Sequence, residues 1–539
     1  MAAHLFLNRR QALAAGLSVI ATSQITRANA PQLGRVTGQP EATAAGEEVL
    51  SKGGNVYDAI VTAAFTAAVA APYQCGPCGY GGSFIASNGA VVDFNSTAPA
   101  ASSENMFAAD ASGRVKNNVN THGWLAAGVP GILAGLELIL KRYGTWKLSA
   151  VLERAINLAR DGIIVDGALR RSIQSAKTNF TKDQGSAEIY LPGGMVPELG
   201  TTLKNPSLAK LLQSFADAQT TADFYHGEAA RKVAAAFKSH GGLVAERDLA
   251  NYAPLELQPV AWNRSGVTVF TPPPTAGGVT ALQTLAVLDR LGKSDWAMND
   301  WTSTRAIIEA TRLCWDDRLR LLGDPLKPTS VPTLPWQALF DEQRLKNHAS
   351  SVAASLSTGK PVIAKSDGRT ASGTIHLSAV DALGNFAALT LTHGGGFGAQ
   401  VTVPGLGVTL GHGMSRFDPR PGHPNSPGPG KRPLHNMCAS IVARDGQPIM
   451  ALGGRGGRRI PSAIVHVLFA HLFCNQSPRD ALASPRLHCE GDMDLVLDAN
   501  WPDNIVQHVQ RAGYATSRSA IAVVSAAWRD GHNFDALTK

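Results

Sequence analysis

The stretch "SGTIHLSAVDALGNFAALTLTHGGGFG", Ser372 to Gly398, predicts two short strands joined by a tight turn. Thr374 stands at the first position of the first strand, directly after Gly373. A cut between these two residues would give the threonine a free α-amine, whose pKa of about 8 suits a base, beside its own hydroxyl nucleophile. Glycine at position 373 leaves the scissile carbonyl open to attack by the threonine oxygen. The stretch therefore predicts a nucleophile that is activated by cleavage.

The segments before this stretch favour helices, and those after it favour strands. Residues 41–71 have a helical pattern with a stop at Gly53-Gly54-Asn55, and residues 131–144 carry apolar residues at helical spacing. A proline turn at 272–274 leads into another helix. Ser355 to Thr374 is polar, which is typical of an exposed, cleavable loop. This order predicts a layered α/β domain with a potential cut in its middle.

Composition excludes several classes of protein. The chain has 539 residues, of which 44% are hydrophobic, enough for one large core or two smaller ones. Its formal charge of +8 includes three arginines within the first 30 residues, so a chain without that segment carries about +5. This charge is too small and too dispersed to predict a nucleic-acid partner.

The first 30 residues are typical of an export signal. An arginine pair, Arg9-Arg10, precedes an apolar run from Ala12 to Ala21, and Ala28-Asn29-Ala30 gives a small-x-small ending. The run is too short to span a bilayer but suits a signal peptide. The adjacent arginines favour twin-arginine export with cleavage near Ala30; a buried N-terminal helix is the alternative. We therefore expect a periplasmic or secreted protein, and no later segment predicts a membrane anchor.

Cys75 to Cys78 read "CGPC", the spacing of a thioredoxin redox pair. A redox pair needs its first cysteine at a helix N-terminus, which lowers the thiol pKa. Here a helical pattern precedes the motif, and a glycine turn into a strand follows it. A tight loop is therefore favoured over a catalytic thiol pair, and whether a disulfide closes it stays open.

Neither a metal nor a cofactor is expected. The glycines of "GLGVTLGHG", residues 405–413, have the wrong spacing for a dinucleotide-binding loop, and a proline-rich segment follows instead of a helix. No HExxH motif is present, and ligand spacing is lacking at His412, His423, His435, His471 and His488. The glycine spacing therefore disfavours an oxidoreductase, and the histidine spacing disfavours a metal site.

Eight segments share their order and spacing with those of one known family. They read "PEATAAGEEVLSKGGNVYDA" from Pro40, "GVPGILAGLELILKRYGT" from Gly128, "DLANY" from Asp248, "PPPTAGGVTALQ" from Pro272, "GTIHLSAVDALGN" from Gly373, "GPGKRPLHNM" from Gly428, "GGRGGRRI" from Gly453 and "SPRLHCE" from Ser484. On these segments the sequence resembles the gamma-glutamyltranspeptidase family of N-terminal nucleophile hydrolases. The resemblance implies an αββα sandwich, and self-cleavage into a large chain (31–373) and a small chain (374–539) that stay interwoven. It also implies amide hydrolysis or transfer through an acyl-enzyme.

The resemblance assigns the catalytic residues one by one. Thr374 matches the nucleophile, with autocleavage after Gly373, and Thr392 matches the second threonine that supports it. Gly456 and Gly457 match the paired glycines whose N–H groups form the oxyanion hole. Without the family, the two threonines would be ordinary strand residues. "GGRGGRR" would then be a flexible basic turn or an anion-binding nest.

The residues that hold a glutamyl group in the family are replaced here. The family's arginine position is Asn95, its serine pair is His435 and Asn436, its acid is Arg416, and an asparagine is replaced by Gly394. A cation at the position of the acid would repel the ammonium group of a glutamyl substrate. The catalytic residues are therefore kept, whereas the glutamyl-binding residues are not.

Three functions stay open from the sequence. An acylase or amidohydrolase for small acid amides of the glutaryl or oxamate type would use Arg416 as the carboxylate partner, because guanidinium binds carboxylate in a fork. A gamma-glutamyl hydrolase would need Arg416 to point away. Both would act on a small amide, with water or an amine as acyl acceptor. An exported binding protein with a dead active site is the alternative from another class, and retention of Thr374 and Thr392 argues against it.

Overall fold

The hairpin around Thr374 forms as predicted and lies inside a six-stranded sheet. β9 (Gly373–Val380) and β10 (Phe386–Gly394) pair antiparallel, with Thr374 opposite Thr392. The strand order is β1-β9-β10-β2-β3-β6. The flanking strands are β1 (Arg35–Thr37), β2 (Gly81–Ala86), β3 (Val91–Asp93) and β6 (Leu255–Leu257). The computed structural model describes residues 34–110, 114–298, 300–327, 330, 334–364 and 373–539, so the predicted export signal lies outside the described residues.

A second six-stranded sheet faces the first one. Its order is β19-β18-β14-β13-β8-β7. Apolar side chains from both inner faces, among them Val380 and Phe386 from the first sheet and Ile441 and Ala451 from the second, form one buried cluster. The strands of the second sheet are β7 (Val260–Arg264), β8 (Val267–Thr271), β13 (Ser440–Arg444), β14 (Gln447–Arg455), β18 (Val523–Asp530) and β19 (Asn533–Thr538).

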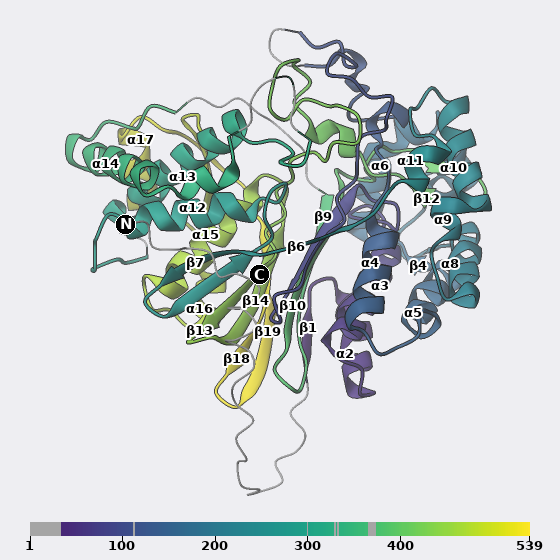
Figure 1. Ribbon diagram of the computed structural model, residues 1–539, viewed down its shortest axis with the longest axis horizontal. Coiled ribbons are helices and arrows are strands. Elements are labelled where there is room, and N and C mark those ends of the chain that lie inside the picture. The colour runs from purple at the N-terminus through teal and green to yellow at the C-terminus, as the bar shows by residue number, and fades with distance from the viewer. Residues whose placement is uncertain (1–33, 111–113, 299, 328–329, 331–333, 365–372) are drawn as a thin grey trace, which may run out of the picture.

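Helices cover the outer face of each sheet (Figure 1). The core outside the first sheet contains residues of α2 (Pro40–Ser51), α3 (Val56–Ala70), α4 (Ile132–Tyr143), α5 (Leu148–Asp161), α8 (Pro206–Ala218) and α10 (Glu228–Ser239). The core outside the second contains residues of α12 (Gly278–Asp289), α13 (Trp301–Leu321), α14 (Glu342–Thr358), α15 (Arg459–Leu472) and α16 (Pro478–Ala483). The remaining helices are α6 (Gly167–Phe180), α7 (Gln184–Tyr190), α9 (Asp223–His226), α11 (Glu246–Ala250) and α17 (Asp503–Arg511). The small strands are β4 (Ile163–Ile164), β5 (Thr202–Leu203), β11 (Thr402–Val403), β12 (Val408–Thr409), β15 (Leu487–His488), β16 (Asp494–Leu497) and β17 (Ala515–Arg518). The predicted α/β class is confirmed.

The side chains of β9 alternate between two buried environments. Ile375 and Leu377 belong to the core under the helices, whereas Val380 belongs to the core between the sheets. Because a strand covered on both faces has no solvent side, β9 is buried along its whole length. Its polar residues, Thr374, His376 and Ser378, therefore lie in the protein interior, where each needs a hydrogen-bond partner.

The helical prediction for residues 41–71 is confirmed in detail. α2 ends before Gly53-Gly54, and α3 begins after Asn55, whose side chain and that of Asp58 form a capping box. One prediction is wrong at its start: Ser355 does not begin an exposed loop, because α14 continues to Thr358. Ser355 is buried, since its hydroxyl donates to Glu309 at 2.8 Å.

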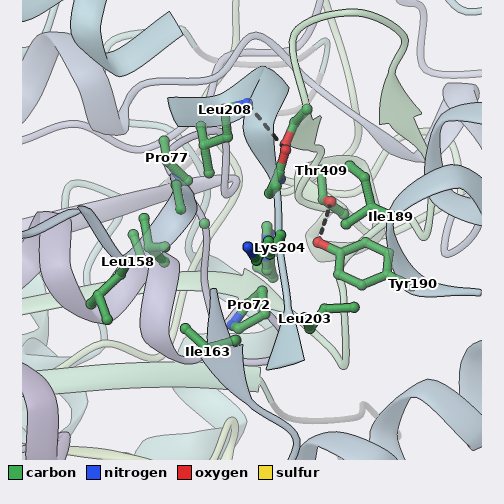
Figure 2. Close-up of a pocket in the computed structure, with 17 residues that line it drawn as sticks. Pro72, Pro77, Leu158, Ile163, Ile189, Tyr190, Leu203, Lys204, Leu208 and Thr409 are labelled. Atoms are coloured by element: carbon green, nitrogen blue, oxygen red, sulfur yellow. Dashed lines mark hydrogen bonds between the residues drawn. The ribbon is translucent and has the colours of Figure 1, made fainter. Parts of the chain in front are cut away.

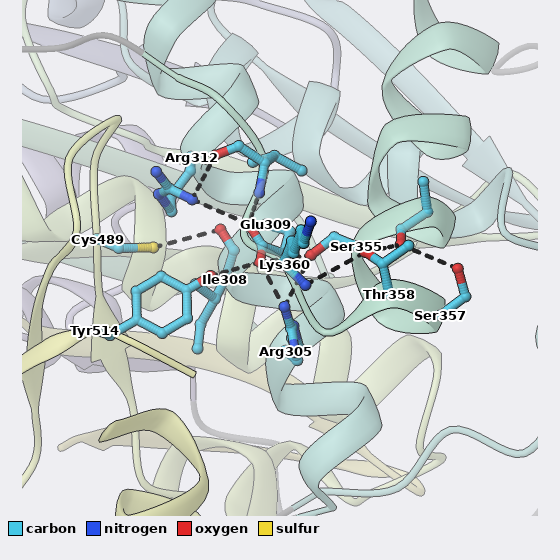
Figure 3. A network of polar contacts seen from close by, with 12 residues as sticks. Arg305, Ile308, Glu309, Arg312, Ser355, Ser357, Thr358, Lys360, Cys489 and Tyr514 are labelled. Carbon is cyan, nitrogen blue, oxygen red and sulfur yellow. Dashed lines mark hydrogen bonds and ion pairs between the residues drawn. The ribbon is translucent and has the colours of Figure 1, made fainter. Parts of the chain in front are cut away.

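Glu309 on α13 connects segments from both sides of Thr374 (Figure 3). Its carboxylate accepts hydrogen bonds from the Ser355 hydroxyl, from the Val362 backbone N–H at 3.1 Å and from the Tyr514 hydroxyl at 2.5 Å. Arg312 pairs with the same carboxylate at 3.1 Å and also donates to the backbone carbonyl of Gly491. The segment after α14 is thus tied to residues near the C-terminus.

Both sheets mix strands from before and after Thr374. β9 and β10 lie between β1 and β2, and β13 pairs with β8. The two sides of the predicted cut therefore share their cores. No helix in the described part of the chain is long and apolar enough to cross a membrane.

Candidate active site

Two threonine hydroxyls meet at the end of the β9–β10 hairpin. The Oγ1 atoms of Thr374 and Thr392 are 2.9 Å apart, and both side chains are buried. The Thr392 hydroxyl donates to the carbonyl of Gly373, and it accepts from the N–H of Gly394 at 2.8 Å. Because Thr392 has only one hydroxyl hydrogen, the hydrogen between the two oxygens belongs to Thr374. The two predicted threonines are therefore linked to the carbonyl of the predicted cleavage site.

Gly373 has no space for a side chain. A Cβ atom at this position would lie 2.4 Å from the carbonyl oxygen of Gly395. The strand pairing shifts here by one residue, so that Gly373 lies opposite Gly394 while Thr374 lies opposite Thr392. This irregularity brings the Gly373 carbonyl within reach of the Thr392 hydroxyl.

A polar layer extends from the threonines between the two sheets. His376 Nδ1 lies 2.7 Å from Thr390 Oγ1, and its Nε2 lies 3.0 Å from Ser378 Oγ. Burial lowers the pKa of His376 to about 3, so the ring is neutral. A Cβ atom on Gly453 of β14 would lie 2.3 Å from this ring, so the two sheets are in contact at this point.

Gly456 and Gly457 form the turn between β14 and α15. Their φ angles are +146° and +64°, a region that favours glycine. β14 is paired with β18 up to Arg455, and α15 begins at Arg459. Within the described part of the chain, neither glycine N–H donates to a backbone carbonyl. The turn follows the same strand that contacts His376, and it begins three residues after Gly453.

Arg416 is bonded to Gly394, the residue whose N–H donates to the Thr392 hydroxyl. It closes the 3₁₀ turn Gly413–Arg416, and its Nη2 donates to the carbonyl of Gly394 and lies 3.1 Å from His412 Nε2. Gly394 has φ +94°, and a Cβ atom there would lie 2.2 Å from His412 and 2.9 Å from Arg416. Arg416 and His412 therefore occupy the space that a side chain at position 394 would need.

Asn95 and His435 contact the same residue, Thr275. Asn95 Nδ2 donates to the Thr275 hydroxyl at 3.0 Å, and the His435 N–H donates to the Thr275 carbonyl at 3.1 Å. Asn95 Oδ1 and both ring nitrogens of His435 are buried without a hydrogen-bond partner among the described residues. Asn436, the next residue, is only half-buried. Unpaired buried polar atoms are costly, which is typical of a site that binds a ligand.

Positive charge surrounds His435. Burial, together with Arg318, Arg432 and Arg416, lowers the pKa of His435 to about 3. Arg318 is fully buried and donates to the His435 carbonyl at 2.7 Å, and burial lowers its pKa to about 10. Among the described residues, Arg318 donates to the backbone carbonyls of Ala276 and His435 and to no carboxylate, so this region favours an anionic ligand. Sequence reasoning missed Arg318 and His412, because neither has a local pattern that distinguishes it from a structural residue.

A mostly apolar hollow is lined by Leu158, Ile163, Ile189 and Leu203 (Figure 2). His393, the neighbour of Thr392, lines it together with Tyr190, whose hydroxyl lies 2.8 Å from that of Thr409. Successive side chains of a strand point to opposite faces, so this hollow does not open onto the Thr392 hydroxyl. It contains none of the predicted site residues.

The cysteines of "CGPC" lie in the loop between α3 and β2. Cys75 and Cys78 are both free thiols in this structure and fully buried, and burial raises the pKa of each well above its usual range. A thiol with a raised pKa is a poor nucleophile, so the geometry favours the loop over a catalytic pair. Among the residues that the structure describes, no cluster of His, Cys, Asp and Glu could hold a metal ion.

Comparisons with known proteins agree with the family resemblance of the eight quoted segments. The family model described as Gamma-glutamyltranspeptidase matches residues 42–539. The chain is 31% identical over 467 residues to the glutathione hydrolase proenzyme of Escherichia coli (strain K12), covering 83% of this chain and 79% of the relative. It is also 31% identical over 497 residues to the Acylase ACY 1 proenzyme of Pseudomonas sp. (strain SE83), covering 90% and 87%.

The fold agrees with a solved structure. The cephalosporin acylase from Bacillus halodurans superposes with a TM-score of 0.83 at 23% identity, covering 97% of this chain and 99% of that one. Family model, relatives and fold together show that this chain is an amide hydrolase of the gamma-glutamyltranspeptidase family.

Proposed function

We propose that this protein is an autoprocessed hydrolase whose N-terminal threonine, Thr374, cleaves an amide bond of a small acidic acyl compound. The observation that carries the proposal is the hydrogen-bonded series from Thr374 through Thr392 to the Gly373 carbonyl. A hydroxyl nucleophile, a supporting hydroxyl and a scissile carbonyl are the three groups that self-cleavage requires. The facing sheets with helices on their outer faces support an αββα sandwich of the N-terminal nucleophile type.

Self-cleavage would proceed through an ester. Thr374 Oγ1 attacks the carbonyl carbon of Gly373 and gives up its proton, the bond from that carbon to the Thr374 nitrogen breaks, and the nitrogen takes up one proton to become the free amine. The Thr392 hydroxyl, which donates to the Gly373 oxygen, stabilises the negative charge that develops there. Water then hydrolyses the ester, leaving a large chain that ends at Gly373 and a small chain of residues 374–539.

The mature site would use the same hydroxyl on an external amide. The freed α-amine of Thr374 takes the proton of Oγ1 while the oxygen attacks the substrate carbonyl, and the leaving amine departs with a proton. The N–H groups of Gly456 and Gly457 bind the oxygen that becomes negative. Water or a second amine then releases the acyl group from Thr374. A binding protein with a dead active site would not need the hydroxyls of Thr374 and Thr392. Both hydroxyls are present and hydrogen-bonded to each other, which supports an enzyme.

The acyl group is proposed to carry a carboxylate and no α-amine. Arg416 and Arg318 supply positive charge beside the hydroxyl pair and His435, whose ring is neutral. An ammonium group would be repelled in this region, whereas a carboxylate would gain charge-assisted hydrogen bonds. The acylase and the glutathione hydrolase are each 31% identical to this chain, so their names do not distinguish an acylase from a gamma-glutamyl enzyme.

The location of the protein is proposed from its first 30 residues alone. Their arginine pair and small-x-small ending support export to the periplasm, with cleavage near Ala30. The large chain would then comprise residues 31–373.

The experiment that tests the maturation is a denaturing gel of the purified protein with N-terminal sequencing of its smaller piece. We expect two bands, the smaller beginning with Thr-Ile-His-Leu at residue 374. A chain that stays whole and still hydrolyses amides at full rate would overturn the proposal.

A further inference from the structure

Two sequence segments without an assigned role meet beside the glycine turn. Arg458 directly follows Gly457, and Glu490 ends the segment "SPRLHCE". Arg458 Nε donates to Glu490 Oε1 at 2.5 Å and Nη2 donates to Oε2, so the guanidinium and the carboxylate form a bidentate pair. Their side chains are 15% and 9% exposed. The residue next to the turn is thus held by a buried carboxylate.

The contact continues from Glu490 back to the same helix. His488 Nε2 lies 3.3 Å from Glu490 Oε1, and His488 Nδ1 lies 2.9 Å from the hydroxyl of Ser462. Ser462 lies one helical turn after Arg458, within α15. We call Arg458, Glu490, His488 and Ser462 the α15 clip, because it attaches the first turn of α15 at two points.

Charge explains why the clip needs its carboxylate. Arg458 is the N-cap of α15, and the first turn contains Arg459 and no acid, although the N-terminus of a helix carries partial positive charge. Arg458 also lies 5.1 Å from the ring centre of Trp315, in a largely buried position. A buried cation that loses its partner is strongly unfavourable, so without the charge of Glu490 the Arg458 side chain would move toward water.

On the helix side, the turn is bonded to the start of α15: the Arg459 N–H donates to the Gly456 carbonyl at 3.3 Å, and the Ile460 N–H donates to the Gly457 carbonyl at 3.2 Å. Strand pairing with β18 fixes β14 up to Arg455, and two glycines without side chains follow. Because glycine has no side chain, the backbone at Gly456 and Gly457 can adopt these positive φ angles and can rotate more freely than at other residues. The direction of their N–H groups therefore depends on where α15 begins.

We propose that Glu490 is a positioning residue of this enzyme: acting through Arg458 and the α15 clip, it fixes the N–H groups of Gly456 and Gly457 toward the substrate oxygen. The inference rests on the proposed function, in which these N–H groups form the oxyanion hole. Glu490 itself touches neither the substrate nor Thr374.

The test is the Glu490→Gln variant, which keeps the shape of the side chain and removes its charge. With an amide of the proposed class we expect kcat to fall roughly ten- to a hundred-fold, the scale of a small misplacement, while KM stays within about twofold. A boronic acid carrying the same acyl group forms a tetrahedral anion on the threonine hydroxyl, so its inhibition constant should rise by the same factor as kcat falls. Binding of the free acid product should not change.

A matched control is Glu137→Gln. Glu137 is a buried acid on α4 that binds Thr221 and Lys141, far along the chain from the turn, and its loss removes a similar buried charge. It should lower stability without lowering kcat. If Glu490→Gln does not fold or mature, Arg458→Lys is the second variant, because it keeps the positive charge but not the bidentate geometry. Its kcat should fall by a smaller factor than that expected for Glu490→Gln, again without a change in KM.

Two outcomes overturn the inference. One is a rise in KM at unchanged kcat, and the other is a loss of kcat no greater than that of Glu137→Gln. The companion variant Gly457→Val shows whether the role of Glu490 is wrong or whether the proposed oxyanion hole is wrong. If Gly457→Val lowers kcat and Glu490→Gln does not, only the role of Glu490 is wrong; if neither lowers kcat, the oxyanion hole lies elsewhere.

Discussion

The two halves of the candidate site differ in how they relate to the family. The resemblance assigns the catalytic roles to Thr374 and Thr392, and their Oγ1 atoms lie 2.9 Å apart. By the same resemblance, five acyl-binding positions carry residues other than those of the family, and two of these positions are in contact: Gly394 leaves the space that Arg416 and His412 fill. Chemistry at the reacting bond requires fixed groups, whereas an acyl pocket can be rebuilt by compensating replacements. Four predictions test whether the two halves are separable in this way.

The largest effect is expected from Thr374→Ala. Without the hydroxyl no ester can form, so the chain should stay whole, and amide hydrolysis should fall to background. A denaturing gel and an activity assay on the same sample measure both. Thr66→Ala is the control, because it removes a buried threonine hydroxyl that only bonds the Thr62 carbonyl within α3. Normal turnover by an uncut Thr374→Ala protein would refute the role of Thr374.

Gly457→Val should have the next largest effect. Valine is unfavourable at φ +64° and would turn the N–H group, so kcat should fall by roughly a hundredfold or more in the cleaved enzyme. Gly531→Val is the control, since Gly531 has φ +60° in an open turn with no atom near its Cβ position. Equal losses of kcat in both variants would point to backbone strain alone.

Arg416→Asp should change which acyl group the enzyme prefers rather than the rate of the chemical step. Glutaryl and gamma-glutamyl anilides differ only in the α-amine, and the unmodified enzyme should prefer the glutaryl compound. The variant should shift the ratio of kcat/KM toward the gamma-glutamyl compound by roughly tenfold, about 1.4 kcal/mol. The shift should be incomplete, because Asn95, His435 and Asn436 still differ from the family's carboxylate-binding residues. An unmodified enzyme that already prefers the gamma-glutamyl anilide, together with no shift in the variant, would place Arg416 outside the acyl pocket. Arg420→Asp, on the same loop, is the control.

The smallest effect concerns acid stability. The pKa of His435 is lowered to about 3 in the folded protein, below its ordinary value of 6.5, so between these values the unfolded chain binds a proton that the folded chain does not. The free energy of unfolding should therefore fall as the pH drops from about 6.5 toward 3, with each such histidine contributing up to about 1.4 kcal/mol per pH unit. His435→Gln should reduce this slope in urea unfolding series.

His466 gives the matched comparison for that measurement. It is buried on α15, and its pKa is also lowered to about 3. His466→Gln should flatten the pH dependence equally but leave KM unchanged, whereas His435→Gln should change KM as well. An equal change of KM in both variants would show that His435 does not contribute to the acyl pocket.

The sequence predicted what depends on local pattern. The β9–β10 hairpin, the stop between α2 and α3 and the α/β class follow from periodicity and glycine positions within short windows. The pairing of Thr374 with Thr392 followed from the family resemblance, and the hairpin register agrees with it.

What the sequence could not predict depends on contacts between distant residues. Ser355 looked exposed because it is polar, but Glu309, 46 positions earlier, gives it a buried partner. The contact of Arg318 with His435 joins positions 117 apart, and the pair of Arg458 with Glu490 joins positions 32 apart. Only the packing of the second sheet brings these residues together, so no local periodicity encodes them.

The interleaved strands have a consequence for the enzyme once it is cut. β9 and β10 lie between β1 and β2, and near the chain ends the hydroxyls of Thr37 and Thr538 are 2.8 Å apart. If the chain is severed after Gly373, the two pieces cannot dissociate without opening both sheets. Melting would then convert one molecule into two, and recovery would become a second-order encounter that slows on dilution. The cut enzyme would then refold less readily than the uncut chain, and its lifetime would be set by the rate at which it unfolds.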